Sequence, residues 1–178
     1  MLEEAACELF LERGYPGTSV ADITTRAGVS RATFFNYVTS KSDLLWAGVD
    51  DAIDDAAARL HPSGEPAAVG THELVRLVVE VAGDLAPGVA VLAFANAEAM
   101  DIHDELRTTG AQRQARLAGI ARKPLRIGGL GPLEADVWSR ACAGAVFAAL
   151  ESWALETPGA RAFAEPLKEA FRALGIEI

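Results

Sequence analysis

A stretch without carboxylates lies near the N-terminus of an otherwise acidic chain. The 178 residues carry a formal net charge of -9 at pH 7, yet residues 23–42 contain no Asp or Glu and include Arg26, Arg31 and Lys41. A protein needs cations only where it touches phosphate groups, so an acidic total leaves room for a local anion-binding surface. The charge pattern therefore predicts such a surface within this stretch.

A short polar helix face in this stretch has the residue types that read base edges. Phe34 and Val38 lie one helical turn apart and are expected to pack inward. Ala32, Thr33 and Asn36 then share the opposite side of the helix. A small polar face of this kind fits the major groove of DNA, where Asn36 can bond a base edge and Ala32 allows close approach.

Groups beside this face extend the predicted contact to the DNA backbone. Arg31 lies in the first helical turn, where a cation opposes the helix dipole, so its presence there favours a phosphate or guanine partner. Tyr37 and Lys41 suit phosphate contacts. The full set of predicted DNA-binding residues is Ser19, Ser30, Arg31, Ala32, Thr33, Asn36, Tyr37 and Lys41.

Two capped helices joined by a glycine turn are expected to position these groups. Ser19 can cap the first helix, and Asp22 three positions on completes a capping-box-like pair. Gly28 can take the left-handed conformation that ends this helix, and Ser30 can cap the next one. An ordinary exposed helical hairpin is the alternative, but the three linked features together are far more specific than any one alone. They predict a helix-turn-helix.

The rest of the chain also has helical texture. Apolar residues recur at spacings of three and four, which predicts an all-α protein of about nine helices. A loop at residues 61–66 is the best candidate boundary between two lobes. The expected helices cover residues 1–13, 20–27, 31–38, 41–60, 71–85, 89–100, 102–122, 133–156 and 160–174.

The segment from Glu4 to about Ala47 resembles the DNA-binding domain of the TetR (tetracycline repressor) family. Two positions depart from the family pattern: Phe35 stands where members often carry Tyr, which removes a phosphate hydrogen bond, and Ala32 replaces a usual Gly, which narrows the approach. The resemblance is carried by the pattern Ala6...Leu9-Phe10...Gly14-Tyr15...Thr18-Ser19-Val20...Ile23...Ala27-Gly28-Val29-Ser30...Thr33-Phe34-Phe35-Asn36-Tyr37-Val38...Ser40-Lys41...Asp43-Leu44-Leu45.

The resemblance implies two domains and a regulatory function. We expect a helix-turn-helix DNA-binding domain at residues 1–46 and a helical ligand-binding and dimerisation domain at residues 47–178. The implied protein is a transcription regulator, with a repressor released from a palindromic operator by a small-molecule effector as the leading hypothesis. The effector would favour a conformer whose two DNA-reading heads no longer match the groove spacing.

Two C-terminal helices, near residues 133–156 and 160–174, are expected to pair with their symmetry mates in a homodimer. The first of them has two apolar stripes, one through Trp138, Cys142, Ala145, Ala149 and Trp153 and the other through Val137, Ala141, Gly144 and Ala148. A dimer suits DNA binding because two recognition helices about 34 to 36 Å apart meet successive major grooves. The alternative is that both helices fill a monomeric core.

Six residues are candidates to line an effector cavity that is mostly apolar with a few polar contacts. For each of them, plain core packing is the alternative. They are Phe94, Asn96, Met100, Arg107, Trp138 and Phe147.

No set of residues indicates an enzyme, so we expect no catalytic residue, no metal and no cofactor. The acidic residues around His103 lack the second His that a helical metal site needs, and the glycine-rich residues 127–132 lack the Lys-Ser/Thr of a phosphate loop. The rival from another class is a helical dimeric ligand-binding protein or adaptor that has lost specific DNA recognition. The acidic net charge and a first helix without a basic extension argue for this rival.

The two cysteines and the hydropathy pattern indicate the cellular compartment of the protein. Cys7 and Cys142 lie far apart in sequence, each within an apolar helical pattern, so reduced buried thiols are expected and not a disulfide framework. No run of about 18 apolar residues and no signal-peptide pattern is present. These features predict a cytoplasmic protein with no membrane partner.

Overall fold

The computed structural model describes residues 1–83, 85, 88–156 and 161–177. Within these ranges it contains nine α-helices, one short 3-10 helix and no strand, which confirms the all-α prediction. The helices are α1 (Leu2–Arg13), α2 (Val20–Ala27), α3 (Arg31–Tyr37), α4 (Asp43–Leu60), η1 (Pro62–Gly64), α5 (Thr71–Gly83), α6 (Val89–Ala95), α7 (His103–Ile127), α8 (Pro132–Leu155) and α9 (Ala164–Ala173).

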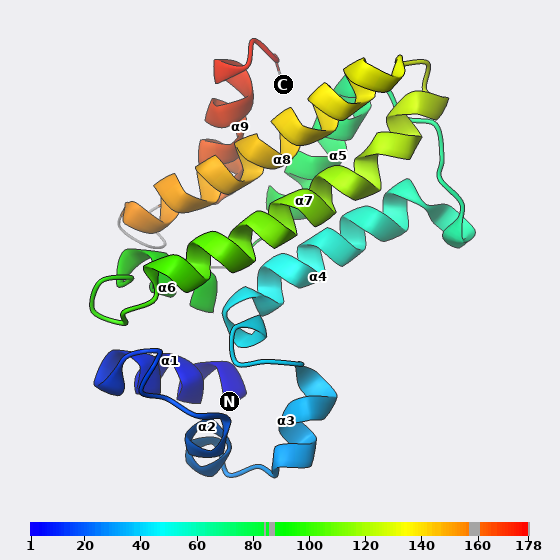
Figure 1. Ribbon diagram of the computed structural model, residues 1–178. Coiled ribbons are helices and arrows are strands. Elements are labelled where there is room, and N and C mark those ends of the chain that lie inside the picture. Colours follow the sequence, from blue (N-terminus) through cyan, green and yellow to red (C-terminus); the bar gives the residue numbers. More distant parts are fainter. Residues whose placement is uncertain (84, 86–87, 157–160, 178) are drawn as a thin grey trace.

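The first three helices form a small unit at one end of the molecule (Figure 1). Its core contains Leu9, Phe10, Ile23 and Phe34, none of which is more than 2% exposed. The buried hydroxyl of Thr18 donates hydrogen bonds to the carbonyls of Leu9 (3.2 Å) and Gly14 (2.9 Å), which fixes the loop between α1 and α2. A few apolar side chains and local hydrogen bonds therefore hold this unit together.

Helix α4 leads from the small unit into the larger helical body, where it lies beside α7 (Figure 1). Its apolar face buries Leu45, Trp46, Ile53 and Leu60, among others, at spacings that keep them on one side of the helix. The predicted domain boundary between residues 46 and 47 falls inside this continuous helix. The division into two domains stays a prediction.

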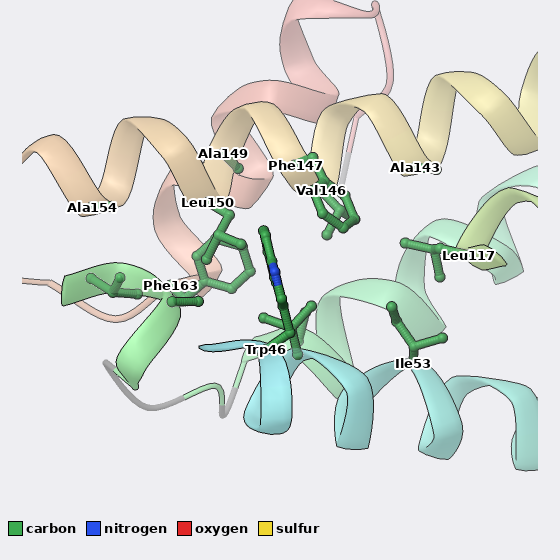
Figure 2. Packing of buried hydrophobic residues seen from close by; sticks show 14 of the residues in the cluster. Trp46, Ile53, Leu117, Ala143, Val146, Phe147, Ala149, Leu150, Ala154 and Phe163 are labelled. Carbon is green, nitrogen blue, oxygen red and sulfur yellow. The ribbon is translucent and has the colours of Figure 1, made fainter. Parts of the chain in front are cut away.

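The larger body consists of α5 to α9 packed around the apolar face of α4. Trp46 and Ile53 of α4 point toward α8, where Val146, Phe147 and Leu150 close the core from the other side (Figure 2). Helices α7 and α8 run side by side, and α9 packs against α8 and α5 (Figure 1). Because many of the inward residues of α8 are Ala, its backbone can approach its neighbours closely.

Several predicted helix bounds need correction, among them the start of the helix expected at residues 41–60, which begins at Asp43. The helix expected at residues 89–100 ends at Ala95, and turns follow to Asp101, whose φ of 50° is left-handed. The third helix ends at Tyr37 because Val38 is already extended. The helix expected at 102–122 continues to Ile127. The last helix begins at Ala164, and residue 160 of the predicted 160–174 helix lies outside the described residues. In the helix expected at 71–85, α5 is described as far as Gly83, residue 84 lies outside the described residues, and Leu85 is not helical.

Helix α7 runs through a proline because another residue replaces the missing hydrogen bond. Pro124 has no backbone N–H, so the carbonyl of Ile120 one turn earlier lacks its helical donor. His61, just after α4, donates from Nε2 to this carbonyl at 2.7 Å. The backbone N–H of Val69 donates to the carbonyl of Pro124 at 3.2 Å. These two hydrogen bonds attach the segment that follows α4 to the last turns of α7.

The described helices also bear on two sequence-based expectations. No helix in the described ranges combines the length and apolarity needed to cross a lipid bilayer. Cys7 and Cys142 are both buried and free, in agreement with the expectation of reduced thiols. Burial raises the pKa of the Cys142 thiol to about 12 and, with a smaller contribution from Glu8, raises the pKa of Cys7.

Candidate functional site

The turn between α2 and α3 has the geometry that its sequence predicts. Ser19 caps α2: its hydroxyl accepts a hydrogen bond from the Asp22 backbone N–H (3.2 Å), while the Asp22 carboxylate accepts one from the Ser19 N–H (2.9 Å). Gly28 ends α2 with φ 68° and ψ 29°, a left-handed conformation that glycine adopts without a steric cost. Ser30 then caps α3 by accepting from the Thr33 N–H at 3.0 Å.

Hydrogen bonding also sets the ionisation of the first cap. The hydroxyl and backbone N–H of Ser19 both donate to the Asp22 carboxylate, and these bonds lower the pKa of Asp22 below its ordinary value. The carboxylate therefore stays charged near the positive end of the α2 dipole.

Helix α3 presents the expected face to solvent. Phe34 is fully buried, whereas Ala32, Thr33, Asn36 and Tyr37 are exposed, Tyr37 to 72%. This pattern follows from the helical period, which puts Phe34 on one side of this two-turn helix and its polar neighbours on the other. Phe35 is also half exposed, so the outer surface of α3 mixes polar and aromatic groups.

The serine and threonine hydroxyl groups of the predicted set make hydrogen bonds within the caps. The Ser30 and Thr33 hydroxyls lie 2.9 Å apart, and the Ser30 oxygen also accepts from the Thr33 N–H. Ser19 is occupied in the same way with Asp22. Ser19 and Ser30 therefore serve first to orient the two helices, and Arg31, Asn36 and Tyr37 are the exposed polar side chains of α3 that are not bound to its cap.

The cations of the carboxylate-free stretch have different surroundings. Arg26 donates to Glu8 (3.0 Å) and to both oxygens of Glu12 (3.0 and 2.8 Å), which raises the pKa of Arg26 further and lowers the pKa of Glu12. Arg31 is exposed at the start of α3 and has no ion pair within the described ranges. The absence of Asp and Glu from residues 23–42 did not reveal that α1 supplies the carboxylates that neutralise Arg26.

Lys41 contacts the protein itself. Its ammonium group donates to the carbonyls of Tyr15 (2.6 Å) and Thr18 (3.0 Å) and lies 3.9 Å from the centre of the Tyr15 ring. Burial lowers the pKa of Lys41, against a smaller opposing effect of Glu105. The lysine expected to contact phosphate at the start of the fourth helix thus precedes that helix and ties the α1–α2 loop to the α3–α4 turn.

Three of the six predicted effector residues meet at one groove in the larger body. Phe94 of α6, Arg107 of α7 and Phe147 of α8 line a groove of about 570 Å³. Its apolar floor includes Gly110, and its rim carries polar and charged side chains. The rim residues are His103, Asp104, Arg107, Gln114 and Glu151.

The other three predicted effector residues have structural environments. Asn96 ends α6 and donates from its side chain to the Leu92 carbonyl at 2.8 Å. Met100 is fully buried, and its carbonyl accepts from the Tyr15 N–H at 2.6 Å. Trp138 is partly buried against the core of the body. None of these three lines the groove.

Helix α8 divides its two predicted stripes between core and surface. Cys142, Ala145, Ala149 and Trp153 of the first stripe are buried. The second stripe is partly open to solvent, with Val137 57% exposed. Large apolar side chains extend it at both ends of the helix: Leu133 and Leu155 are each 76% exposed. The outer side of α8 is therefore apolar and uncovered in a single chain.

Sequence reasoning missed a buried polar cluster between α4 and α7. Arg113 of α7 bonds Asp50 and Asp43 of α4, and Trp46 bonds Thr109 through its indole N–H at 2.8 Å. The partners lie 63 to 70 residues apart in sequence. The aspartates of α4 were a signal in the sequence, but only the fold brings cations opposite them. Among the described residues, no group of His, Cys, Asp and Glu is arranged to hold a metal ion.

The N-terminal helices match known proteins. Residues 2–47 match the family model "Bacterial regulatory proteins, tetR family". The chain is 48% identical over 40 residues to the HTH-type transcriptional repressor DhaR of Mycobacterium sp. (strain GP1). This alignment covers 22% of this chain and 20% of DhaR, so the likeness concerns one segment of that protein.

Solved structures resemble the whole fold. Thermus thermophilus FadR, a TetR-family transcriptional repressor in complex with lauroyl-CoA, is 27% identical and superposes with a TM-score of 0.52 over 99% of this chain and 94% of FadR. A transcriptional regulator from Aquifex aeolicus VF5 is 19% identical, with a TM-score of 0.52 over 98% and 95% of the two chains, and supports the fold alone. The helix-turn-helix segment is thus similar to the tetR family of bacterial regulatory proteins, and the fold of the whole chain is similar to that of a TetR-family repressor.

Proposed function

We propose that this protein is a DNA-binding transcriptional regulator, and specifically a repressor that a small-molecule effector releases from a palindromic operator. The observation that carries the proposal is the exposed face of α3, which is held outward by two capped helix starts and a left-handed glycine. Asn36 can bond a base edge in the major groove, Arg31 can bond phosphate or guanine, and Tyr37 can donate to phosphate.

The internal bonds of Arg26 and Lys41 refine the expected DNA contact. With these two cations engaged by the protein, few phosphates per subunit are neutralised by side chains. The logarithm of the affinity should then fall with the logarithm of salt concentration at about -0.9 per phosphate contacted, which gives a shallow slope. The same bonds are the observation that favours the rival, a dimeric ligand-binding protein or adaptor without specific DNA recognition.

The test of DNA binding is selection of bound fragments from genomic DNA, followed by affinity measurements on the recovered sequence. We expect Asn36→Ala to relax preference at one base pair and Tyr37→Phe to weaken binding to all sequences by a similar factor. Thr108→Ala, at an exposed position of α7, is the matched control and should bind as the original chain does. Failure to recover any sequence above background supports the rival.

We propose that the protein acts as a homodimer through the outer side of α8, together with α9. The uncovered apolar side chains of α8 favour burial against a second copy, because an isologous contact buries the same stripe twice. Small residues such as Gly144 and Ala148 within the stripe let two helices approach closely. Analytical ultracentrifugation at micromolar concentration tests this, and a stable monomer contradicts it.

We propose the groove beside Phe94 and Phe147 as the effector site, for an amphipathic molecule. The aromatic floor suits an apolar part, and Arg107 and Gln114 at the rim suit a polar or charged part. Phe147 also lines a second, wholly apolar cavity of about 40 Å³ between α4, α5, α7 and α8. The relative FadR was solved with lauroyl-CoA, a molecule that combines an apolar chain with a charged head.

Lauroyl-CoA and CoA form a matched pair of probes for this groove. An effector of the proposed class should raise the unfolding temperature and weaken DNA binding, and CoA without the acyl chain should do neither. Phe94→Ala should reduce the response. If no amphipathic probe changes either quantity, the groove assignment is wrong.

A further inference from the structure

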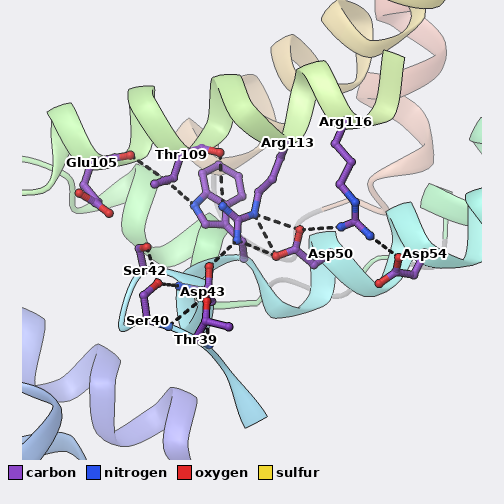
Figure 3. A network of polar contacts seen from close by, with 11 residues as sticks. Thr39, Ser40, Ser42, Asp43, Asp50, Asp54, Glu105, Thr109, Arg113 and Arg116 are labelled. Atoms are coloured by element: carbon purple, nitrogen blue, oxygen red, sulfur yellow. Dashed lines mark hydrogen bonds and ion pairs between the residues drawn. The ribbon is translucent and has the colours of Figure 1, made fainter. Parts of the chain in front are cut away.

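A buried arginine connects the wall of the groove with the helix that follows the DNA-reading face. Arg113 of α7 is 8% exposed, and its guanidinium lies between two carboxylates of α4 (Figure 3). It donates to both oxygens of Asp50 at 2.7 to 3.0 Å and to Oδ1 of Asp43 at 3.1 Å. A planar guanidinium can bridge two carboxylates in this way, whereas the ammonium of lysine cannot match its fork of donors.

Asp43 divides its two oxygens between two parts of the molecule. While Oδ1 accepts from Arg113, Oδ2 accepts from the backbone N–H groups of Thr39 (3.2 Å) and Ser40 (2.9 Å) and from the Thr39 hydroxyl (2.6 Å). Thr39 and Ser40 form the turn between α3 and α4 (Figure 3). Because α3 ends at Tyr37, just before this turn, the hydrogen bonds of Asp43 help to set the orientation of α3 relative to α4.

Trp46 links the same arginine with the groove. The Arg113 guanidinium carbon lies 5.3 Å from the centre of the Trp46 ring. This fully buried ring also contacts Phe94 (centroids 5.7 Å apart) and Phe147 (6.0 Å), both of which line the groove. A methyl group on Gly110, at the floor of the groove, would lie 3.2 Å from the Trp46 ring. The ring therefore has little room to move without moving its neighbours.

We propose that Arg113 is the positioning residue through which a ligand in the groove alters the α3–α4 turn and, with it, the setting of α3. A ligand that displaces Phe94 or Phe147 shifts Trp46, and the Arg113 guanidinium moves with the ring that it covers. Asp43 then loses its bond to Arg113 and keeps only its bonds to the turn. The inference rests on the proposed function for its consequence on DNA, but the physical link between Arg113 and the turn exists without DNA.

Arg116 provides a matched control within the same pair of helices. It lies three residues after Arg113 on α7 and bonds Asp50 (3.4 Å) and Asp54 of α4. Of its carboxylate partners, Asp50 is shared with Arg113 and Asp54 lies further along α4, and neither bonds the α3–α4 turn. Removing the charge of Arg116 therefore loosens α4 from α7 without touching the contact to Asp43.

The test measures the turn directly, by the solvent exchange rates of the Thr39 and Ser40 amide protons in the full chain without DNA. Arg113→Gln should speed exchange at both amides about tenfold, because the loss of one coupled contact shifts local opening by about a factor of ten. Arg116→Gln should change the same rates by less than about twofold. Circular dichroism establishes that each variant is folded, and Arg113→Lys carries the test if Arg113→Gln does not fold.

A double variant separates a relay through Asp43 from general loosening. Once Asp43→Asn has weakened the hold on the turn, adding Arg113→Gln should speed exchange no further, since residues acting through one contact are not additive. Equal acceleration in Arg113→Gln and Arg116→Gln, or no acceleration in Arg113→Gln, overturns the proposal.

The second measurement that tests the proposal is the affinity of each variant for the recovered operator. Arg113→Gln should weaken it about tenfold, and Arg116→Gln by less than about twofold. If the original chain selects no DNA, the proposed function fails while the exchange rates still decide whether Arg113 controls the turn. If DNA binds but Arg113→Gln leaves the affinity unchanged, the proposed function stands and this inference is wrong.

Discussion

The helix-turn-helix and the outer side of α8 are two uncovered surfaces of the chain, and they differ in how they are built. Helix α3 has seven residues, a local cap and one buried aromatic anchor, Phe34. Helix α8 has 24 residues and a row of small and apolar side chains from Leu133 to Ala148. The first surface is polar and depends on a few local bonds, whereas the second is apolar and depends on a large body behind it. A polar partner and an apolar partner are therefore expected at different ends of one molecule.

The largest expected effect tests how much the small unit depends on its anchor. Phe34→Ala should cost about 3–5 kcal/mol, as truncation of a buried Phe does, and a unit with so few core residues should lose its ordered structure. Hydrogen exchange should show lost protection in α1 to α3 and retained protection in α7 and α8. Phe35→Ala, half exposed on the same helix, is the control and should keep protection in all helices. Global unfolding of Phe34→Ala would show that the two regions are not independent.

The next effect concerns the apolar surface. Val137→Arg introduces a charge into the exposed stripe of α8 and, in an isologous dimer, introduces it twice. We expect dimerisation to weaken by about 2–4 kcal/mol, the cost of burying an unpaired charge at an interface, while circular dichroism stays unchanged. Leu11→Arg, at a half-exposed apolar position of α1, should leave the sedimentation behaviour unaltered. A dimer of Val137→Arg as stable as that of the original chain would place the interface elsewhere.

A smaller effect tests the local bonds of the polar surface. Ser30→Ala removes the acceptor of the Thr33 N–H and should lower the free energy of unfolding by about 1 kcal/mol. DNA affinity should fall as well, because the start of α3 becomes less ordered. Urea unfolding measures the first quantity, and Ser30→Asp, which restores an acceptor at the cap, should recover most of it. An unchanged unfolding free energy in Ser30→Ala would show that the cap contributes nothing to α3.

The smallest effect contrasts two glycines of α7. Gly119 is exposed, and outside its own helix backbone no atom of the described residues lies within 4 Å of the point that a methyl group would occupy. Gly119→Ala should therefore raise the free energy of unfolding by about 0.5–1 kcal/mol through helix propensity. Gly110→Ala places the methyl 3.2 Å from Trp46 and should lose that gain. Thermal unfolding measures the stability of both variants. Equal stabilisation by both would mean that the Trp46 ring moves aside for the methyl group without a cost.

The sequence predicted the small unit better than the large body, for a physical reason. The caps at Ser19 and Ser30 and the turn at Gly28 are interactions between near neighbours in the chain, so their residue types alone indicate them. The bonds from Arg113 to Asp50 and Asp43 join residues 63 and 70 positions apart, and no local sequence pattern predicts them. Lys41 shows the same limit within the small unit, because its partner Tyr15 is 26 positions away.

The six predicted effector residues divide along the same line. Phe94, Arg107 and Phe147 come together because α6, α7 and α8 meet at the groove. Helical spacing assigns Asn96 and Met100 to a continuing helix, but the chain leaves the helix at Ala95 and turns them to capping and core roles. Spacing along one helix indicates the type of each side chain, whereas the cavity it faces depends on how helices cross.

The hydrogen bond from His61 to the Ile120 carbonyl attaches the C-terminal end of α4 to α7. That bond and the one between Val69 and Pro124 fix the segment after Leu60 to α7, so a tilt of α4 about this end would displace mainly the opposite end, next to the helix-turn-helix. An 18-residue helix is about 27 Å long, and a tilt of about 5° sweeps its far end through roughly 2 Å. The carbonyl that Pro124 leaves without a helical donor thus supplies an attachment point at one end of α4, and the length of α4 would turn a small tilt about that end into a larger shift at the other.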